Sequence, residues 1–180
     1  MRIVLDIDGV LAAHFEPYAS AIQSKCGANL RATDLSTWDV RIGETDILSM
    51  ITTKLSKQAY LRQVPLVEGA ASGVDRLRDA GHEVLVATHR PATVHSTTRQ
   101  WLAANDIVVD EYLTDVPENK GSIDGDVLID DYHRNVGDAL DAGMEGLLFR
   151  QPWNRRYAVD FESHQIVYEW AEIPETISGL

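Results

Sequence analysis

Residues 1–12 read MRIVLDIDGVLA, and this stretch decides the fold. Residues 3–5 are an uninterrupted apolar run, which is typical of a strand buried on both faces of a parallel sheet. Asp6 and Asp8 follow at once, and Gly9 lets the chain turn sharply away. The pattern predicts a first strand whose carboxyl end carries two acids.

The chain beyond this opening repeats the same kind of strand. Apolar runs bounded by turn residues recur at residues 84–87, 127–129 and 147–149. Helical spacing of apolar side chains lies between them, over residues 74–80, 91–105 and 136–140. Gly81 and Gly143 stand where helices end. We therefore expect an α/β fold with a central parallel sheet flanked by helices.

Residues 13–68 differ from the rest because they contain helical patterns and no comparable buried strand. The apolar spacing over residues 47–55 marks one such helix. Pro65 and Gly69 lie near the return to the alternating pattern. We expect residues 13–68 to form a small helical cap inserted after the first strand, and residues 1–12 and 69–180 to form the core.

Composition limits the partners. The 180 residues include 16 Lys and Arg against 28 Asp and Glu, a formal net charge of −12. This field repels nucleic acid polymers and anionic membranes, whereas a small anionic substrate is compatible with a local group of cations.

Cys26 is the single cysteine, which excludes an internal disulfide and fits a reducing compartment. The apolar run before Asp6 is too short for a signal segment or membrane span, so we expect a cytoplasmic protein.

The acids after the first strand are the sharpest chemical signal. Asp6 and Asp8 point the same way if the strand continues, so one carboxylate can attack while the other moves protons. Ligands in open α/β sheets bind at this edge. The alternative is an acidic turn, because Asp and Gly are common turn formers.

Two later loops carry further candidates. Thr88 follows a strand and precedes a helix, where a hydroxyl and free N–H groups make an anion site, with His89 and Arg90 beside it. Asp130 and Asp131 end another strand and suit a hard cation such as Mg²⁺.

Lys120 would balance charge in that region. The alternatives are a helix cap for Thr88, a solvated surface charge for Arg90, a solvated loop position for Lys120, and a cap pair for the two aspartates.

Four elements follow one another along the chain: the pair Asp6 and Asp8, then Thr88, Lys120, and the pair Asp130 and Asp131. Together they resemble the haloacid dehalogenase superfamily of phosphohydrolases. The resemblance implies a Rossmann-like core, a nucleophile at Asp6 and a general acid/base at Asp8. It further implies phosphate binding by Thr88 and Lys120. The cofactor it implies is Mg²⁺, bound by the carboxylates of Asp6 and Asp130 and the backbone carbonyl of Asp8, with Asp131 nearby.

Within that superfamily the chain is most similar to the 5′(3′)-deoxyribonucleotidase branch. The likeness rests on the opening DIDGVLA, the ten-residue step from Lys120 to Asp130, PWNR at 152–155 and WAEIP at 170–174. It implies a Mg²⁺-dependent phosphatase that hydrolyses (deoxy)nucleoside monophosphates through an aspartyl-phosphate. The chain departs from the branch at Ala13-His14-Phe15, where the family often has an aspartate followed by phenylalanine, and at His89-Arg90, which replace a serine after Thr88.

These departures bear on the substrate. We expect Phe15 to stack on a base, with His14 and Trp38 behind it and His89 beside the phosphate, whereas Tyr18 and Tyr60 fill the core of the cap. Two alternatives are a related phosphatase of a sugar phosphate or specialised metabolite, and a non-catalytic binding protein on the same scaffold. The sequence leaves open the base, the sugar, the 5′ or 3′ position and whether the chain forms a homodimer.

Overall fold

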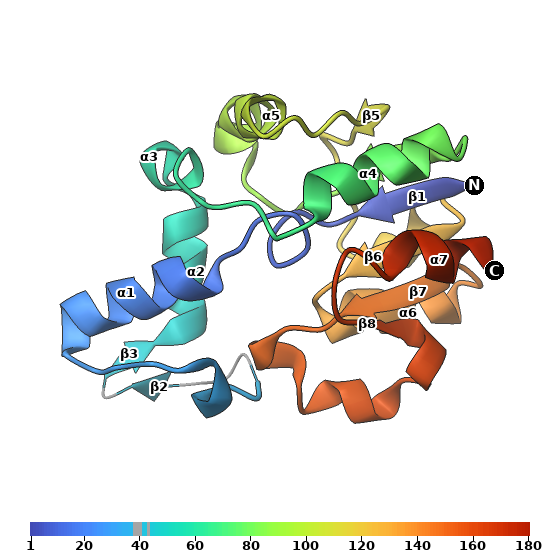
Figure 1. The fold of residues 1–180 in the computed structure, drawn as a ribbon. Coiled ribbons are helices and arrows are strands. Elements are labelled where there is room, and N and C mark those ends of the chain that lie inside the picture. The colour runs from blue at the N-terminus through green and yellow to red at the C-terminus, as the bar shows by residue number, and fades with distance from the viewer. Residues whose placement is uncertain (38–40, 43) are drawn as a thin grey trace.

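A six-stranded parallel sheet forms the centre of the molecule (Figure 1), and the computed structural model describes residues 1–37, 41–42 and 44–180. The strand order is β5-β4-β1-β6-β7-β8. The strands are β1 (Arg2–Leu5), β4 (Glu83–Val86), β5 (Glu111–Tyr112), β6 (Val127–Asp130), β7 (Glu145–Phe149) and β8 (Ile166–Val167). The α/β prediction is confirmed, and β1, β4, β6 and β7 lie at the four apolar runs.

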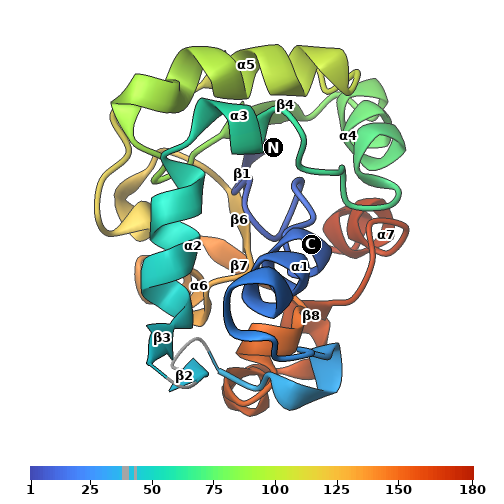
Figure 2. The same cartoon turned by 90° about the vertical axis from the view of Figure 1, so that its left-hand side faces the viewer.

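Helices cover both faces of this sheet. They are α4 (Ala70–Asp79), α5 (His95–Ala104), α6 (His133–Asp141) and α7 (Ile173–Ser178). Figure 2 shows α4 and α7 on one side of the sheet and α6 on the other. Gly81 and Gly143 have φ values of 85° and 84°, so they end α4 and α6 as expected. None of the helices in the described ranges is long and apolar enough to cross a bilayer.

Two features of the core region differ from the expectation. The helix expected over residues 91–105 begins late, because Pro91 has an extended ψ of 145° and a 3₁₀ turn, Ala92–Val94, precedes α5. The outer strands β5 and β8 were not predicted. Each has only two residues and lies at an edge of the sheet, where a long apolar run is not needed.

Residues 13–68, which we call the cap segment, lie beyond the carboxyl ends of the strands (Figure 1). The segment contains α1 (Phe15–Cys26), α2 (Ile47–Leu55), α3 (Gln58–Leu61) and an unpredicted antiparallel pair, β2 (Arg41–Ile42) and β3 (Thr45–Asp46). Four of its side chains form a separate apolar cluster that Trp153, from the loop after β7, completes: Tyr18, Ile22, Leu30 and Leu35. The cap segment thus has an apolar core of its own, to which Trp153 contributes, while Val64 near its end packs in the main core.

Trp170 fixes the C-terminal segment against the start of the chain. Its side chain is buried, and its indole N–H donates to the backbone carbonyl of Val10 at 2.8 Å. A Cβ on Gly73 of α4 would lie 2.3 Å from the indole ring, so the missing side chain lets the helix approach the tryptophan. This contact holds α4, the C-terminal segment and the loop after β1 together.

We predict that Gly73→Ala destabilises the protein. Overpacking against Trp170 costs about 1–3 kcal/mol, which exceeds the gain of at most about 1 kcal/mol from better helix propensity. Gly137→Ala in α6 is the matched control, since nothing lies within 4 Å of its added Cβ. Denaturant unfolding of both variants checks this, and equal stability of the two would contradict the packing argument.

Candidate active site

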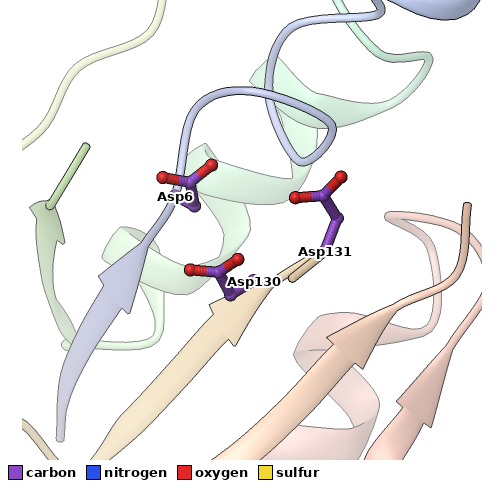
Figure 3. A group of neighbouring side chains, drawn as sticks. All are labelled: Asp6, Asp130 and Asp131. Atoms are coloured by element: carbon purple, nitrogen blue, oxygen red, sulfur yellow. The ribbon is translucent and has the colours of Figure 1, made fainter. Parts of the chain in front are cut away.

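Three acids meet where the strand order reverses. The chain leaves β1 towards β4 and leaves the adjacent β6 towards β7, and open α/β sheets bind ligands at the carboxyl ends of such a pair of strands. Asp6 follows β1, Asp130 ends β6 and Asp131 comes next. Figure 3 shows their carboxylates around one space, and an oxygen of each lies within 4.8 Å of the others. All three residues are buried.

Lys120 joins two of these acids. Its Nζ donates to Asp6 Oδ1 and to Asp130 Oδ2, both at 2.7 Å, and only 1% of its side chain is exposed. Asp130 also accepts hydrogen bonds from the backbone N–H of Tyr132 and from the Asn135 side chain, each at 2.8 Å. The alternative that Lys120 is a solvated loop residue is therefore wrong.

One ammonium does not neutralise this group of acids. Burial raises the pKa of Asp6 to about 7, against the opposing effect of Lys120. Burial, then the charges of Asp130 and Asp6, raise the pKa of Asp131 well above its ordinary value. Three carboxyl groups whose oxygens lie within 4.8 Å of one another, with one ammonium between two of them, are an oxygen donor set for a hard divalent cation, so the residues present fit Mg²⁺.

The loop after β1 is shaped to fit these acids. The backbone N–H of Asp8 donates to Asp6 Oδ2 at 2.9 Å, which fixes the Asp6 carboxylate. Gly9 has a φ of 90°, and a Cβ there would lie 2.2 Å from Asp131 Oδ2. The Gln151 side chain donates to the Gly9 carbonyl at 2.6 Å. Only glycine meets both the conformation and the space at this position.

Asp8 lies in a different environment, between Arg90 and His14. Nε of Arg90 donates to Asp8 Oδ2 at 2.9 Å and its Nη2 donates to Oδ1 at 2.5 Å. His14 Nε2 lies 2.5 Å from Oδ1. Burial alone would raise the pKa of Asp8, but Arg90 and His14 hold it below its ordinary value, so these two contacts favour the ionised form of the carboxyl.

Arg90 is the functional residue that sequence reasoning missed. Its side chain is fully buried, so the interpretation as a solvated surface charge is wrong. The sequence feature that could have indicated its role is its position two residues after Thr88, in the same loop at the end of β4. Thr88 is buried, and its hydroxyl accepts a hydrogen bond from the backbone N–H of Arg90 at 3.3 Å.

The other predicted residues lie in different places. His89 is exposed and its Nε2 lies 2.9 Å from the Pro117 carbonyl, away from the acids. Phe15 begins α1, half-buried against the cluster of the cap segment. His14 is buried, with both ring nitrogens bound inside the protein. Trp38 lies outside the described residues. The structure thus gathers Asp6, Asp8, Thr88, Lys120, Asp130 and Asp131 at one edge of the sheet.

Trp153 links the acids to the cap segment. Its indole N–H donates to Asp131 Oδ2 at 2.5 Å, while the ring packs in the cluster of the cap segment. Asn154 donates to the Asp131 carbonyl at 2.9 Å and to the Phe149 carbonyl at 2.8 Å. In the sequence, residues 152–155 (PWNR) contributed only to the family resemblance, and no contact was predicted for them.

Comparisons with known proteins agree with this arrangement. The family model described as 5′ nucleotidase, deoxy (pyrimidine), cytosolic type C protein matches residues 1–179. A predicted phosphatase from Clostridium acetobutylicum is 14% identical with a TM-score of 0.67, over 99% of this chain and 98% of that chain. A HAD family hydrolase from Deinococcus radiodurans R1, with bound phosphate and sodium, is 15% identical with a TM-score of 0.65, over 99% and 95%.

A third structure is D,D-heptose 1,7-bisphosphate phosphatase from B. bronchiseptica, complexed with magnesium and phosphate. It is 15% identical with a TM-score of 0.53, over 99% of this chain and 98% of that chain. At these identities the solved structures show the shared fold. No curated protein sequence matches the chain.

We predict that Lys120→Met lowers stability near neutral pH. Removing one partner of a buried ion pair costs about 3–5 kcal/mol because the remaining charges are uncompensated. Without the ammonium the pKa of Asp6 would rise further above about 7, so the loss should be largest at alkaline pH and shrink as Asp6 takes up its proton towards about pH 7. Lys25→Met, at an exposed position, is the control. A loss of unfolding free energy that does not change with pH would contradict the electrostatic origin.

We also predict that Mg²⁺ binds more tightly at about pH 8 than at about pH 6, because a ligand carboxyl must lose its proton before it binds metal. With the pKa of Asp6 at about 7, affinity should fall by up to about tenfold for each pH unit below that value. Calorimetric titration at several pH values measures this. Equal affinities at both ends of the range would show that Asp6 is not a ligand.

Proposed function

This chain belongs to the 5′ nucleotidase, deoxy (pyrimidine), cytosolic type C family, and we propose that it hydrolyses (deoxy)nucleoside monophosphates with Mg²⁺. It is a phosphoric monoester hydrolase with a haloacid dehalogenase fold. The observation that carries the proposal is the buried group of Asp6, Lys120 and Asp130 at the carboxyl ends of β1 and β6. The family description is of a cytosolic type, which supports a role in the cytoplasm.

The first step is attack by the Asp6 carboxylate on the phosphorus. Lys120 and the backbone N–H of Asp8 orient the two oxygens of Asp6. The P–O bond to the alcohol breaks and its electron pair goes to the leaving oxygen, which receives the proton that Asp8 took from water in the preceding turnover. The product is an aspartyl-phosphate on Asp6. A bound Mg²⁺, held by the carboxylates of Asp6 and Asp130 and the Asp8 carbonyl, would supply positive charge that offsets the repulsion between the phosphate and the acids.

The second step returns Asp6 to its starting state. Asp8 takes a proton from water as the water oxygen attacks the phosphorus, and the bond from phosphorus to Asp6 breaks. The Thr88 hydroxyl and Lys120 bind the phosphate oxygens in both steps, with fixed donors that need no rearrangement. Two displacements by one pair of acids thus replace a single difficult displacement.

The cap segment would select the leaving group. Phe15 begins α1 and directly follows His14, which contacts Asp8, so it is our first candidate for a contact with the leaving group. Trp38 and His89 are the further candidates for contacts with the substrate. A panel of ribo- and deoxynucleoside 5′- and 3′-monophosphates and sugar phosphates, with and without Mg²⁺, tests the proposal. Faster phosphate release from a sugar phosphate than from every nucleotide would overturn the substrate class.

We predict that Asp6→Asn abolishes turnover and leaves the fold intact. The amide has nearly the same volume as the carboxyl but is not a nucleophile, and removing a covalent nucleophile commonly costs several orders of magnitude in rate. Phosphate release and the melting temperature are measured on the same sample. Near-normal activity in this variant would show that Asp6 is not the nucleophile.

Phe15→Ala should impair nucleotide hydrolysis more than hydrolysis of a small generic phosphate ester. Loss of stacking on a base costs roughly 1–3 kcal/mol, or about 5- to 150-fold. If Phe15 only packs in the cap segment, its truncation should depress both substrates alike and lower the melting temperature. The two specificity constants therefore separate base recognition from packing.

A further inference from the structure

The two oxygens of Asp8 are not equivalent. Oδ1 receives His14 Nε2 at 2.5 Å and Arg90 through Nη2 at 2.5 Å and Nε at 3.1 Å. Among the residues that the structure describes, Oδ2 receives only Arg90 Nε, at 2.9 Å. The donors are shielded from water, since the side chains of Arg90 and His14 are 0% and 1% exposed against 18% for Asp8. Oδ1 is therefore saturated, whereas Oδ2 keeps room for another partner.

Arg90 is itself held in place. Its Nη1 donates to the Thr98 hydroxyl of α5 at 3.2 Å, and its guanidinium carbon lies 5.9 Å from the centre of the Trp101 ring. The guanidinium plane is thereby fixed on a helix of the core. A fork of this kind sets the plane of a carboxylate, which a lysine ammonium does not do.

His14 connects the same oxygen to the cap segment. A carboxylate only accepts hydrogen bonds, so Nε2 of His14 carries the hydrogen that bonds to Asp8. Nδ1 then lies 2.9 Å from the hydroxyl of Tyr60 in α3, and the imidazole stacks on Tyr18 with centroids 5.1 Å apart. The contact of His14 with Asp8 thus depends on where α3 lies.

We propose that Arg90 and His14 are positioning residues that clamp Asp8 and leave Oδ2 as the oxygen that carries the exchanged proton. The inference rests on the proposed function, in which Asp8 is the acid and base. With the proton on Oδ2, Oδ1 keeps its donors. As the P–O bond breaks, its electron pair and this proton go to the leaving oxygen, and water later returns a proton to Oδ2.

The clamp also gives a common reason for both departures from the deoxyribonucleotidase pattern. One departure places His14 before Phe15, and the other places Arg90 after Thr88. The two residues are 76 positions apart, by the difference of their numbers, and they meet on one carboxylate. Neither has to touch the substrate to affect the reaction.

The test compares an alkyl phosphate, whose leaving group needs a proton, with p-nitrophenyl phosphate, whose leaving group does not. The measured quantity is kcat/KM, because it covers the steps up to alcohol release and excludes hydrolysis of the aspartyl-phosphate. Arg90→Lys and His14→Leu should lose about 10- to 100-fold on the alkyl ester and only about 2- to 3-fold on the aryl ester. Equal losses on both esters would overturn the proposal.

Matched variants separate positioning from packing. His14→Gln keeps an N–H donor at the place of Nε2, so it should recover most of the loss on the alkyl ester. Tyr60→Phe removes the hydroxyl that faces Nδ1. The difference between its losses of kcat/KM on the two esters should be smaller than in His14→Leu. Arg99→Lys, on the exposed face of α5, is the control and should lose the same factor on both esters. A larger loss on the alkyl ester in this control would contradict the clamp.

A second measurement does not depend on activity. Nitrogen NMR of the arginine side chains should show slow rotation of the Arg90 guanidinium in the wild type and in Asp6→Asn, and fast rotation in Asp8→Asn. Fast rotation in the wild type would overturn the clamp. If the wild type releases phosphate from neither ester and from no nucleotide of the panel, the proposed function fails and the proton-carrying role of Oδ2 with it. The NMR result still decides whether Arg90 holds Asp8.

Discussion

The ammonium of Lys120, between the carboxylates of Asp6 and Asp130, is the contact on which the rest of the site depends. It joins the ends of β1 and β6 to a loop that follows β5, so three distant segments meet at one buried charge. Without a fixed cation, two ionised acids at neighbouring strand ends would repel each other in a medium that screens charge poorly. The same ammonium leaves part of the negative charge uncompensated, which is the condition for binding a hard divalent cation and a phosphate together.

Asp8 and Asp131 lie outside this ion pair, and other side chains hold them. Arg90 and His14 hold Asp8, whereas Trp153 holds Asp131. Both sets of contacts include the cap segment. His14 contacts Tyr60, and Trp153 packs in the apolar cluster of the cap segment. A movement of the cap segment would therefore act on Asp8 and on Asp131 at once. This is a physical route by which binding a leaving group of the right shape would complete the site.

The sequence predicts the parts of this structure that depend on local pattern. Strands such as β6 are buried on both faces, so they read as continuous apolar runs, and acids at their ends must meet at one edge of the sheet. The edge strand β5 has no such run, because a short, half-exposed strand does not need one. Arg90 and Trp153 could not be placed either, since their burial depends on carboxylates 82 and 22 residues away. Spacing along the chain does not encode such partners.

The central claim is that Asp6 attacks phosphorus while Lys120 holds its carboxylate in place. The most direct measurement is mass spectrometry of protein quenched in acid during turnover of a nucleoside monophosphate with Mg²⁺. The account predicts one phosphoryl group on the peptide that carries Asp6, and after a single turnover in ¹⁸O-water it predicts the heavy oxygen in the released phosphate and not in Asp6. Phosphate release with the phosphoryl group on another residue, or with ¹⁸O in the Asp6 carboxylate, would contradict it.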